Sequence, residues 1–219
     1  MKYVYFYFCL TVFLLFFTTC SKKTNKKLAN DYYKLSLLEL GGQDGNTESL
    51  KKALINLDLA LNYDDDSKYL ALKASILFKL NQLPDAKKIF EQILAKKIDD
   101  GLKTEILNNY ACLLAQLGNT GQALKIWADL QNDKNYLTPE VALFNQSKVY
   151  FELNEPQKAK GKLLQAVFLE PGYLDAHYSL AQIFVNLKEF DSAKKELTTV
   201  LFLEPTHETA QKLLDSISI

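Results

Sequence analysis

Apolar residues recur along most of this chain with the three- and four-residue spacing of amphipathic helices, and polar residues fill the positions between them. The clearest stretch, residues 140–207, predicts two pairs of helices whose bulky and small positions repeat after 34 residues. The matching positions are Tyr150 and Phe184, Ala159 and Ala193, Leu163 and Leu197, Leu169 and Leu203, and Pro171 and Pro205. A single helix pair cannot bury its apolar face alone, so such repeats stack on one another into a solenoid.

The same frame continues toward the N-terminus with small insertions. Each second helix carries an alanine between bulky residues, and the small side chain lets the two helix backbones of a pair approach closely. Extra residues between units are expected in the turns near 99–101 and 137–139, because turns absorb changes of length at a small cost in free energy. The predicted units begin near residues 34, 67, 104, 140 and 174.

The two ends of the array differ from the repeat. A helix is predicted over Leu28–Leu40, and the glycine-rich run 41–46 cannot continue it. The next helix is predicted over Glu48–Asn62, with Thr47 as its N-cap. Residues 208–218 predict a single helix that covers the apolar face of the last pair.

The positions of small and large residues resemble the tetratricopeptide repeat. In that family, residues 8, 20 and 27 of each 34-residue unit are small, and residue 32 is often proline; the unit from Leu174 has Ala181, Ala193 and Pro205 at three of these positions. The resemblance implies an all-α, right-handed α-solenoid over residues 28–219, with about five helix pairs and a C-terminal capping helix. Proteins of this family bind other proteins on the concave wall of the solenoid and rarely catalyse reactions.

The first residues of the chain are different in kind. A lysine followed by the apolar run Tyr3–Phe17 predicts a secretory signal over residues 1–19. Because the run ends at Cys20, it resembles a bacterial lipoprotein signal, which implies lipid on that cysteine and a lysine-rich tether over residues 20–27. Thr19 stands where the family has a smaller residue, so an uncleaved membrane anchor, ordinary cleavage and a cytosolic protein remain alternatives. We predict that the protein lies in the cell envelope and is attached to a membrane. The periplasmic side of the outer membrane is one location that fits this prediction.

Charge and residue content argue against several kinds of site. Lysine plus arginine equals aspartate plus glutamate at 26 each, so no net field attracts nucleic acid. His177 is expected in a packed position and His207 in an exposed turn, and neither belongs to a catalytic or zinc motif. Asp64–Asp66 and Asp99–Asp100 lack the spacing of a calcium loop and are expected to cap helices. Cys112 is expected to act as a small hydrophobic residue. We therefore predict no catalytic residue, no metal and no cofactor.

The predicted binding site follows from the family resemblance. Tetratricopeptide proteins line their concave face with positions 2, 5, 9 and 12 of each first helix. In this chain, aromatic rings at those positions would anchor a peptide and amides would bind its backbone. An alternative is that some of these rings pack between adjacent helices. The candidate peptide-binding residues at and beside these positions are Lys68, Ser75, Phe78, Asn108, Asn109, Phe144, Asn145, Lys148, Phe151, Tyr178 and Gln182.

A second resemblance covers residues 104–171. The segments Leu107–Ala111 and Tyr136–Pro139, with the residues that lead to Ala159, are similar to type IV pilus biogenesis lipoproteins that act as pilotins. In that family a lipidated repeat array escorts an outer-membrane secretin and helps it form a ring. Three functions are therefore open: a membrane-tethered adaptor for a segment of another envelope protein, a pilotin-like lipoprotein, and a self-associating structural array without a peptide ligand. The sequence does not specify the partner or the oligomeric state.

Overall fold

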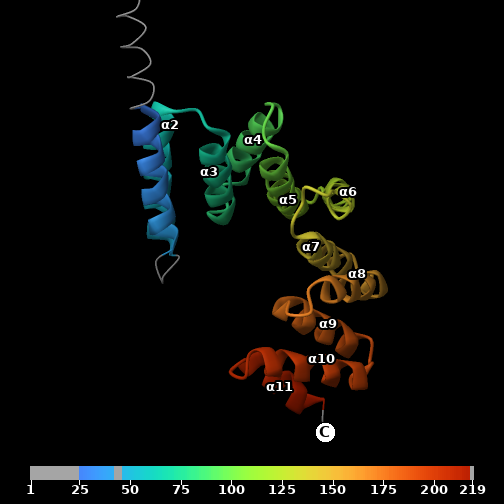
Figure 1. Ribbon diagram of the computed structural model, residues 1–219. Helices are drawn as coiled ribbons and strands as arrows, with labels where there is room; N and C mark the ends of the chain where they lie inside the picture. The colour runs from blue at the N-terminus through green and yellow to red at the C-terminus, as the bar shows by residue number, and fades with distance from the viewer. Residues whose placement is uncertain (1–24, 42–45, 218–219) are drawn as a thin grey trace, which may run out of the picture. The chain divides into compact units, whose positions relative to one another are not determined.

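The computed structural model describes residues 25–41 and 46–217, and within these ranges the chain forms α-helices joined by short turns, with no strand (Figure 1). It divides into an N-terminal unit that ends at Ile98 and a C-terminal unit that begins at Asp99. The N-terminal unit contains a helix over residues 25–41, α2 (Thr47–Tyr63), α3 (Ser67–Lys79) and α4 (Leu83–Leu94). The C-terminal unit contains α5 (Asp100–Gln116), α6 (Thr120–Leu130), α7 (Pro139–Glu152), α8 (Pro156–Leu169), α9 (Leu174–Asn186), α10 (Phe190–Leu203) and α11 (Glu208–Ser216).

The predicted all-α array of helix pairs is confirmed, and the differences lie at the ends of helices. The N-cap of α2 is Asn46, not Thr47, because the Asn46 side chain accepts a hydrogen bond from the Ser49 backbone N–H. The first helix already includes residues 25–27, three residues before the predicted start. The predicted signal over residues 1–19 and the lipid site at Cys20 lie outside the described residues.

Aspartates cap two helices, as the sequence predicted. The Asp66 carboxylate accepts a hydrogen bond from the Lys68 backbone N–H at 3.0 Å, at the start of α3. The Asp99 carboxylate accepts from the N–H groups of Gly101 and Leu102 at 2.9 and 3.2 Å, at the start of α5. Because Asp99 is the N-cap of α5, Asp100 and Gly101 belong to the helix. The expectation that they lie in the turn between units was wrong.

The turn inside each of four helix pairs depends on one residue with positive φ. These residues are Asn81, Gly118, Asn154 and Lys188, with φ of 59°, 81°, 59° and 61°. Each follows the C-terminus of a first helix, where a left-handed residue lets the next backbone N–H groups satisfy the last helical carbonyls. After Asn154, for example, the Glu155 N–H donates to the Tyr150 carbonyl at 2.8 Å. The reversal of the chain is therefore built into the end of each first helix.

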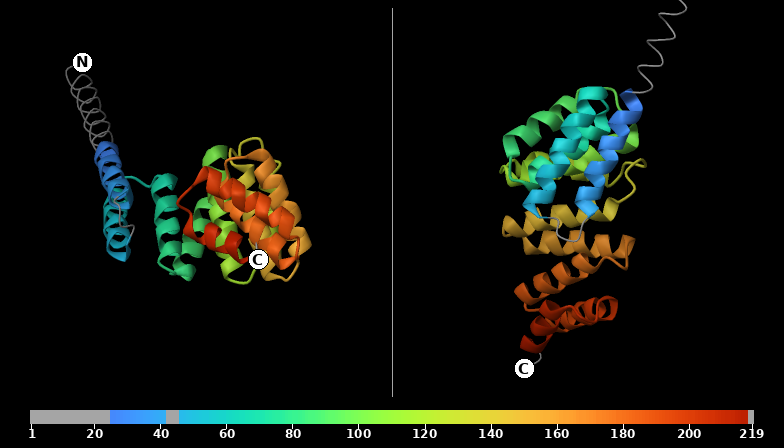
Figure 2. Two further views of the ribbon diagram at one scale, coloured as in Figure 1. Left: turned by 90° about the horizontal axis from the view of Figure 1, so that it is seen from below. Right: turned by 90° about the vertical axis from the view of Figure 1, so that its left-hand side faces the viewer.

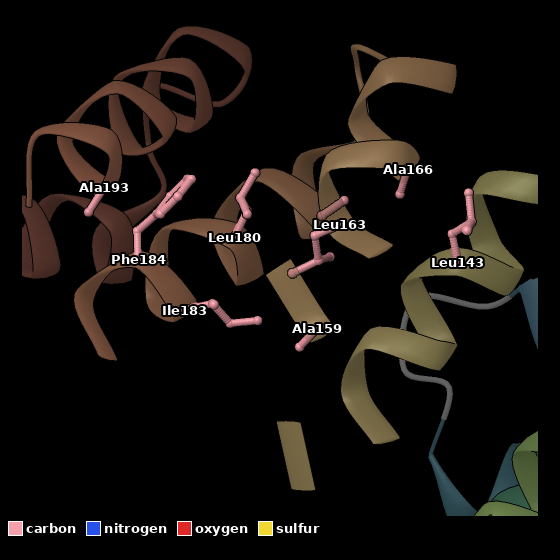
Figure 3. Close-up of a cluster of buried hydrophobic side chains, with 9 residues drawn as sticks. Leu143, Ala159, Leu163, Ala166, Leu180, Ile183, Phe184 and Ala193 are labelled. Carbon is pink, nitrogen blue, oxygen red and sulfur yellow. The ribbon is translucent and has the colours of Figure 1, made fainter. Parts of the chain in front are cut away.

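Buried alanines hold the helix pairs of the C-terminal unit together. Ala159 on α8 and Ala193 on α10 are fully buried, and both lie in one cluster with Leu163 and Leu180 (Figure 3). The pair α7–α8 lies beside the pair α9–α10, because α8 packs against α9 (Figure 2). Full burial of a leucine side chain stabilises the fold by roughly 1.5–3 kcal/mol, so this cluster is a major source of stability.

The N-terminal unit has a core of its own. Helix 25–41 packs on α2 and α3 through Ala29, and the rings of Tyr33 and Tyr69 lie 5.1 Å apart. The buried members of this core are Ala29, Leu50, Ala53, Leu57, Ala60, Tyr69 and Ile76.

Histidine side chains fasten the last helix pair and the C-terminal helix. His177 is buried, with Nδ1 2.6 Å from a Glu196 carboxylate oxygen and Nε2 3.0 Å from the Pro171 carbonyl oxygen. The ring thus ties α9 to α10 and to the turn before α9. His207 is the N-cap of α11, where its Nδ1 accepts a hydrogen bond from the Ala210 N–H at 3.1 Å.

Cys112 lies half-buried on α5. Burial raises the pKa of its thiol to about 11, and the nearby Lys148 ammonium opposes the shift. Since the thiolate is the nucleophile, a thiol with this pKa is poorly reactive at neutral pH. The pKa supports the interpretation of Cys112 as a packing residue.

Replacing Ala159 with leucine should destabilise the chain by about 1–3 kcal/mol, because a larger side chain overpacks the close contact between α7 and α8. Gln157→Leu adds a similar apolar side chain at an exposed position of the same helix and should change the free energy of unfolding by less than about 0.5 kcal/mol. Urea unfolding followed by circular dichroism measures both. Equal effects of the two substitutions would contradict the account of the core.

Alkylation of Cys112 should be slow in the folded protein and fast after unfolding. A pKa of about 11, against an ordinary value of 9.0, leaves a roughly hundredfold smaller thiolate fraction at pH 8. The rate in the folded state should keep rising about tenfold per pH unit to pH 10, whereas the rate in the unfolded state levels off near pH 9. Mass spectrometry of the peptide that contains Cys112 measures the rate, and equal rates in both states at pH 8 would refute the assignment.

Candidate functional site

The predicted binding residues lie on the first helices of both units. Eight of them lie in the C-terminal unit: Asn108 and Asn109 on α5, Phe144, Asn145, Lys148 and Phe151 on α7, and Tyr178 and Gln182 on α9. We call the surface that these three helices contribute the first-helix face. The other three, Lys68, Ser75 and Phe78, lie on α3 of the N-terminal unit.

A groove of about 230 Å³ opens between α7 and α9 on the first-helix face. Three predicted residues line it: Lys148, Phe151 and Gln182. Its apolar lining includes Leu163 of α8 and Ile183 of α9, which are 0% and 4% exposed. Phe151, in contrast, keeps 43% of its surface exposed. The remaining lining residues are Ser147, Glu152 and Ser179.

The chemistry of the groove suits a short peptide. Its apolar floor can accept an aliphatic or aromatic side chain, and the amide of Gln182 can exchange hydrogen bonds with a peptide backbone. Among the described residues, no carboxylate lies within ion-pair distance of the Lys148 ammonium. That ammonium instead lies 5.2 Å from the centre of the Phe144 ring, so it remains available to an acidic group of a ligand.

Two predicted aromatic anchors already pack against the chain itself. Phe144 is half-buried, and its ring centre lies 5.2 Å from that of Tyr173. The Tyr178 ring lies 4.9 Å from the His207 ring and contacts the cluster shared by α9, α10 and α11. Phe144 and Tyr178 therefore pack within the protein, which was the alternative to a role as peptide anchors.

The predicted amides on α5 and α7 join helices to one another. The side-chain oxygen of Asn108 accepts hydrogen bonds from Trp127 Nε1 at 3.0 Å and from Asn145 Nδ2 at 3.2 Å. The same nitrogen of Asn145 lies 3.5 Å from Cys112 Sγ. These bonds connect α5, α6 and α7, so both amides position the first-helix face. Asn109 is half-buried beside them on α5.

The predicted residues of the N-terminal unit also make contacts inside their own unit. The Lys68 ammonium lies 5.5 and 5.0 Å from the ring centres of Tyr33 and Tyr69. Ser75 donates a hydrogen bond to the Ala71 carbonyl at 3.0 Å, and Phe78 is half-buried. A groove of the N-terminal unit, between α2, α3 and α4, is lined by Asp58, Lys73 and Asp85 among others and by none of these three residues.

Sequence reasoning missed part of the groove. Ser179 and Glu152 line it one position beyond the fifth and twelfth residues of their units, and Ile183 lines it one position beyond the ninth. Position rules for the repeat could have found these residues if they had included the neighbouring row of each first helix. Leu163 comes from a second helix, so no rule for first helices could have found it.

Other kinds of site find no support in the described residues. Within residues 25–41 and 46–217, no group of three or more histidine, cysteine, aspartate or glutamate side chains could hold a metal ion. None of the helices in that part of the chain has the length and apolar character needed to cross a membrane.

Comparisons with known proteins identify the repeat. Residues 174–207 match the tetratricopeptide repeat family. No curated protein sequence matches the chain significantly.

Solved structures extend the similarity to the whole fold. PilW, a widely conserved type IV pilus biogenesis factor, has a TM-score of 0.73 and 21% identity, with 87% of this chain and 84% of PilW covered. PilF of Pseudomonas aeruginosa has a TM-score of 0.68 and 17% identity, with 89% and 90% covered. YrrB, described as a tetratricopeptide repeat protein with an unusual peptide-binding site, has a TM-score of 0.56 and 19% identity, with 89% and 95% covered. Residues 174–207 are therefore a tetratricopeptide repeat, and the chain has the fold of tetratricopeptide repeat proteins.

Proposed function

We propose that the chain is a membrane-tethered adaptor of the cell envelope that binds a segment of another envelope protein in the groove between α7 and α9. The observation that carries the proposal is the groove itself, which has an apolar floor and a polar rim on the first-helix face of a repeat fold. Tetratricopeptide repeats act mainly in protein interactions, and their stacked helices form extended binding surfaces.

The groove defines the chemistry of the segment. An apolar side chain would contact the exposed part of the Phe151 ring, above the nearly buried Ile183 of the groove floor. An acidic residue beside it would meet the Lys148 ammonium at the rim. We therefore expect a short segment in which an aliphatic or aromatic residue is followed or preceded by aspartate or glutamate.

The tether rests on the sequence before the described residues. The apolar run and Cys20 resemble a lipoprotein signal, and at most four residues separate Cys20 from the helix that includes residue 25. A chain of that length reaches about 17 Å when extended, so a lipid on Cys20 would hold the N-terminal unit close to the membrane. Stable attachment would require more than one acyl chain.

A pilotin-like role is the second candidate. The chain covers 84% of PilW, a type IV pilus biogenesis factor, and the likeness extends over the fold. A secretin would then be the protein captured by the groove. The third candidate, a structural array without a peptide ligand, predicts instead that the groove residues have no effect on capture of any other protein.

Replacing Phe151 with alanine should weaken capture of the partner about tenfold, because an aromatic ring that becomes buried on binding is a typical hot spot. Phe190→Ala is a matched control, since Phe190 on α10 is 45% exposed and lies outside the groove. Co-purification from cross-linked cells, with identification of the captured protein, measures the effect, and circular dichroism checks that helicity is unchanged. The groove assignment fails if both variants retain the same partner equally well.

Labelled palmitate should enter the full-length chain and depend on Cys20. Cys20→Ser should abolish incorporation, because the lipid is expected on that thiol. Cys112→Ser should leave incorporation unchanged, since Cys112 is half-buried with a raised pKa. Loss of label in neither variant, or in both, would contradict the proposed tether.

A further inference from the structure

Helix 25–41 of the N-terminal unit exposes a row of leucines. Leu28, Leu35 and Leu38 follow one another after seven and three residues, so they lie along one face of the helix. Their exposed fractions are 37%, 47% and 71%. Ala29, on the side of the helix that packs on α2 and α3, is fully buried. We call the three leucines the leucine row. A continuous apolar row on a surface marks a site of interaction with a membrane or another macromolecule.

Lysines run along one edge of the leucine row. Lys27 and Lys34 each precede a leucine of the row by one residue, and both are exposed. Among the described residues, no carboxylate lies within ion-pair distance of either ammonium. Asp31 is exposed on the same face, one helical turn from each of these lysines. Since Lys26 is exposed as well, three lysines stand against this one exposed carboxylate, and the surface around the row is positive.

A tyrosine lies along the other edge of the row. Tyr32 follows Leu28 by four residues and precedes Leu35 by three, and it is half-buried. Its ring stacks on that of Tyr63 of α2, with the ring centres 6.0 Å apart. Tyrosine is enriched where membrane hydrocarbon meets the headgroups, because its ring is apolar and its hydroxyl group is polar. Leucines flanked by lysines and tyrosine are typical of a helix that lies in the interface of a bilayer.

The chain before this helix favours a membrane as the occupant of the row. At most four residues separate Cys20 from residue 25, and two of them are Lys22 and Lys23. Leu28 begins the row three residues later, and the row extends roughly 15 Å along the helix axis to Leu38. A lipid on Cys20 would hold the row within reach of the headgroups. Because such a tether raises the effective concentration of the bilayer, a weak affinity of the row itself would suffice.

We infer that the leucine row docks on a phospholipid bilayer with anionic headgroups. The three leucines lie at the boundary between headgroups and acyl chains, and Lys27 and Lys34 contact the phosphate groups. The inference rests on the tether proposed above and goes beyond it. A tether alone would leave the N-terminal unit free to rotate, whereas docking holds one side of helix 25–41 against the membrane.

A benzophenone amino acid at position 38 of the full-length chain, produced in cells, tests this inference. Irradiation of the isolated membranes should attach phospholipid at this position, because benzophenone inserts into the C–H bonds of nearby acyl chains. Position 37 is the matched control, since Leu37 is 42% exposed on the same helix but lies about 100° around the axis from Leu38. Mass spectrometry of the labelled peptide should find at least fivefold less lipid adduct at position 37.

Reversal of charge provides a second readout. Lys27→Glu combined with Lys34→Glu should reduce the lipid adduct at position 38 at least fivefold, because each basic residue near an anionic membrane contributes about a fivefold factor in affinity. Lys125→Glu combined with Lys195→Glu makes the same change in net charge at exposed positions of the C-terminal unit. This control pair should leave the yield of lipid adduct unchanged.

The membrane fraction separates failure of this inference from failure of the tether. A chain that is recovered with the membranes but captures no more lipid at position 38 than at position 37 would overturn the inference and leave the tether standing. Capture of a protein in place of lipid at position 38, or equal effects of the two lysine pairs, would overturn the inference as well. Absence of the wild-type chain from the membrane fraction would refute both the tether and the docking.

Discussion

The close contact between paired helices at buried alanines is the constraint on which the rest of the C-terminal unit depends. Ala159 and Ala193 have no exposed surface, and Leu163 packs in the same cluster. Leu163 also lines the groove between α7 and α9. The side chain that fills the space beside the alanine thus forms part of the candidate site. A change in the distance between the helices of a pair would therefore change both stability and the shape of the groove.

The fold could be predicted from the sequence because the same pattern of small and large residues recurs in successive units of about 34 residues. Helix ends were less predictable, since they depend on single hydrogen bonds, as with Asn46 at the start of α2 and Asp99 at the start of α5. The candidate site could be predicted in part. Lys148, Phe151 and Gln182 line the groove as predicted. Phe144 and Asn108 lie at equally favourable positions, but Phe144 packs against Tyr173. Asn108 accepts hydrogen bonds from Trp127 and Asn145. The position of a residue within a repeat predicts the helix face on which it lies. The side chain that it contacts on that face depends on neighbouring residues, which the repeat pattern does not specify.

The first-helix face of the C-terminal unit combines apolar and polar groups in one groove. The first-helix face has a small groove with an apolar floor, an available ammonium and an amide, which suits a peptide of mixed character.

Photo-cross-linking from position 151 tests the central claim most directly. A benzophenone amino acid placed there in cells should form an adduct with one other envelope protein, because the side chain lies in the groove and remains partly exposed. The same group at position 190, which is exposed outside the groove, should not form that adduct. Absence of any adduct from position 151, or an identical adduct from both positions, would contradict the claim that the groove between α7 and α9 binds the partner.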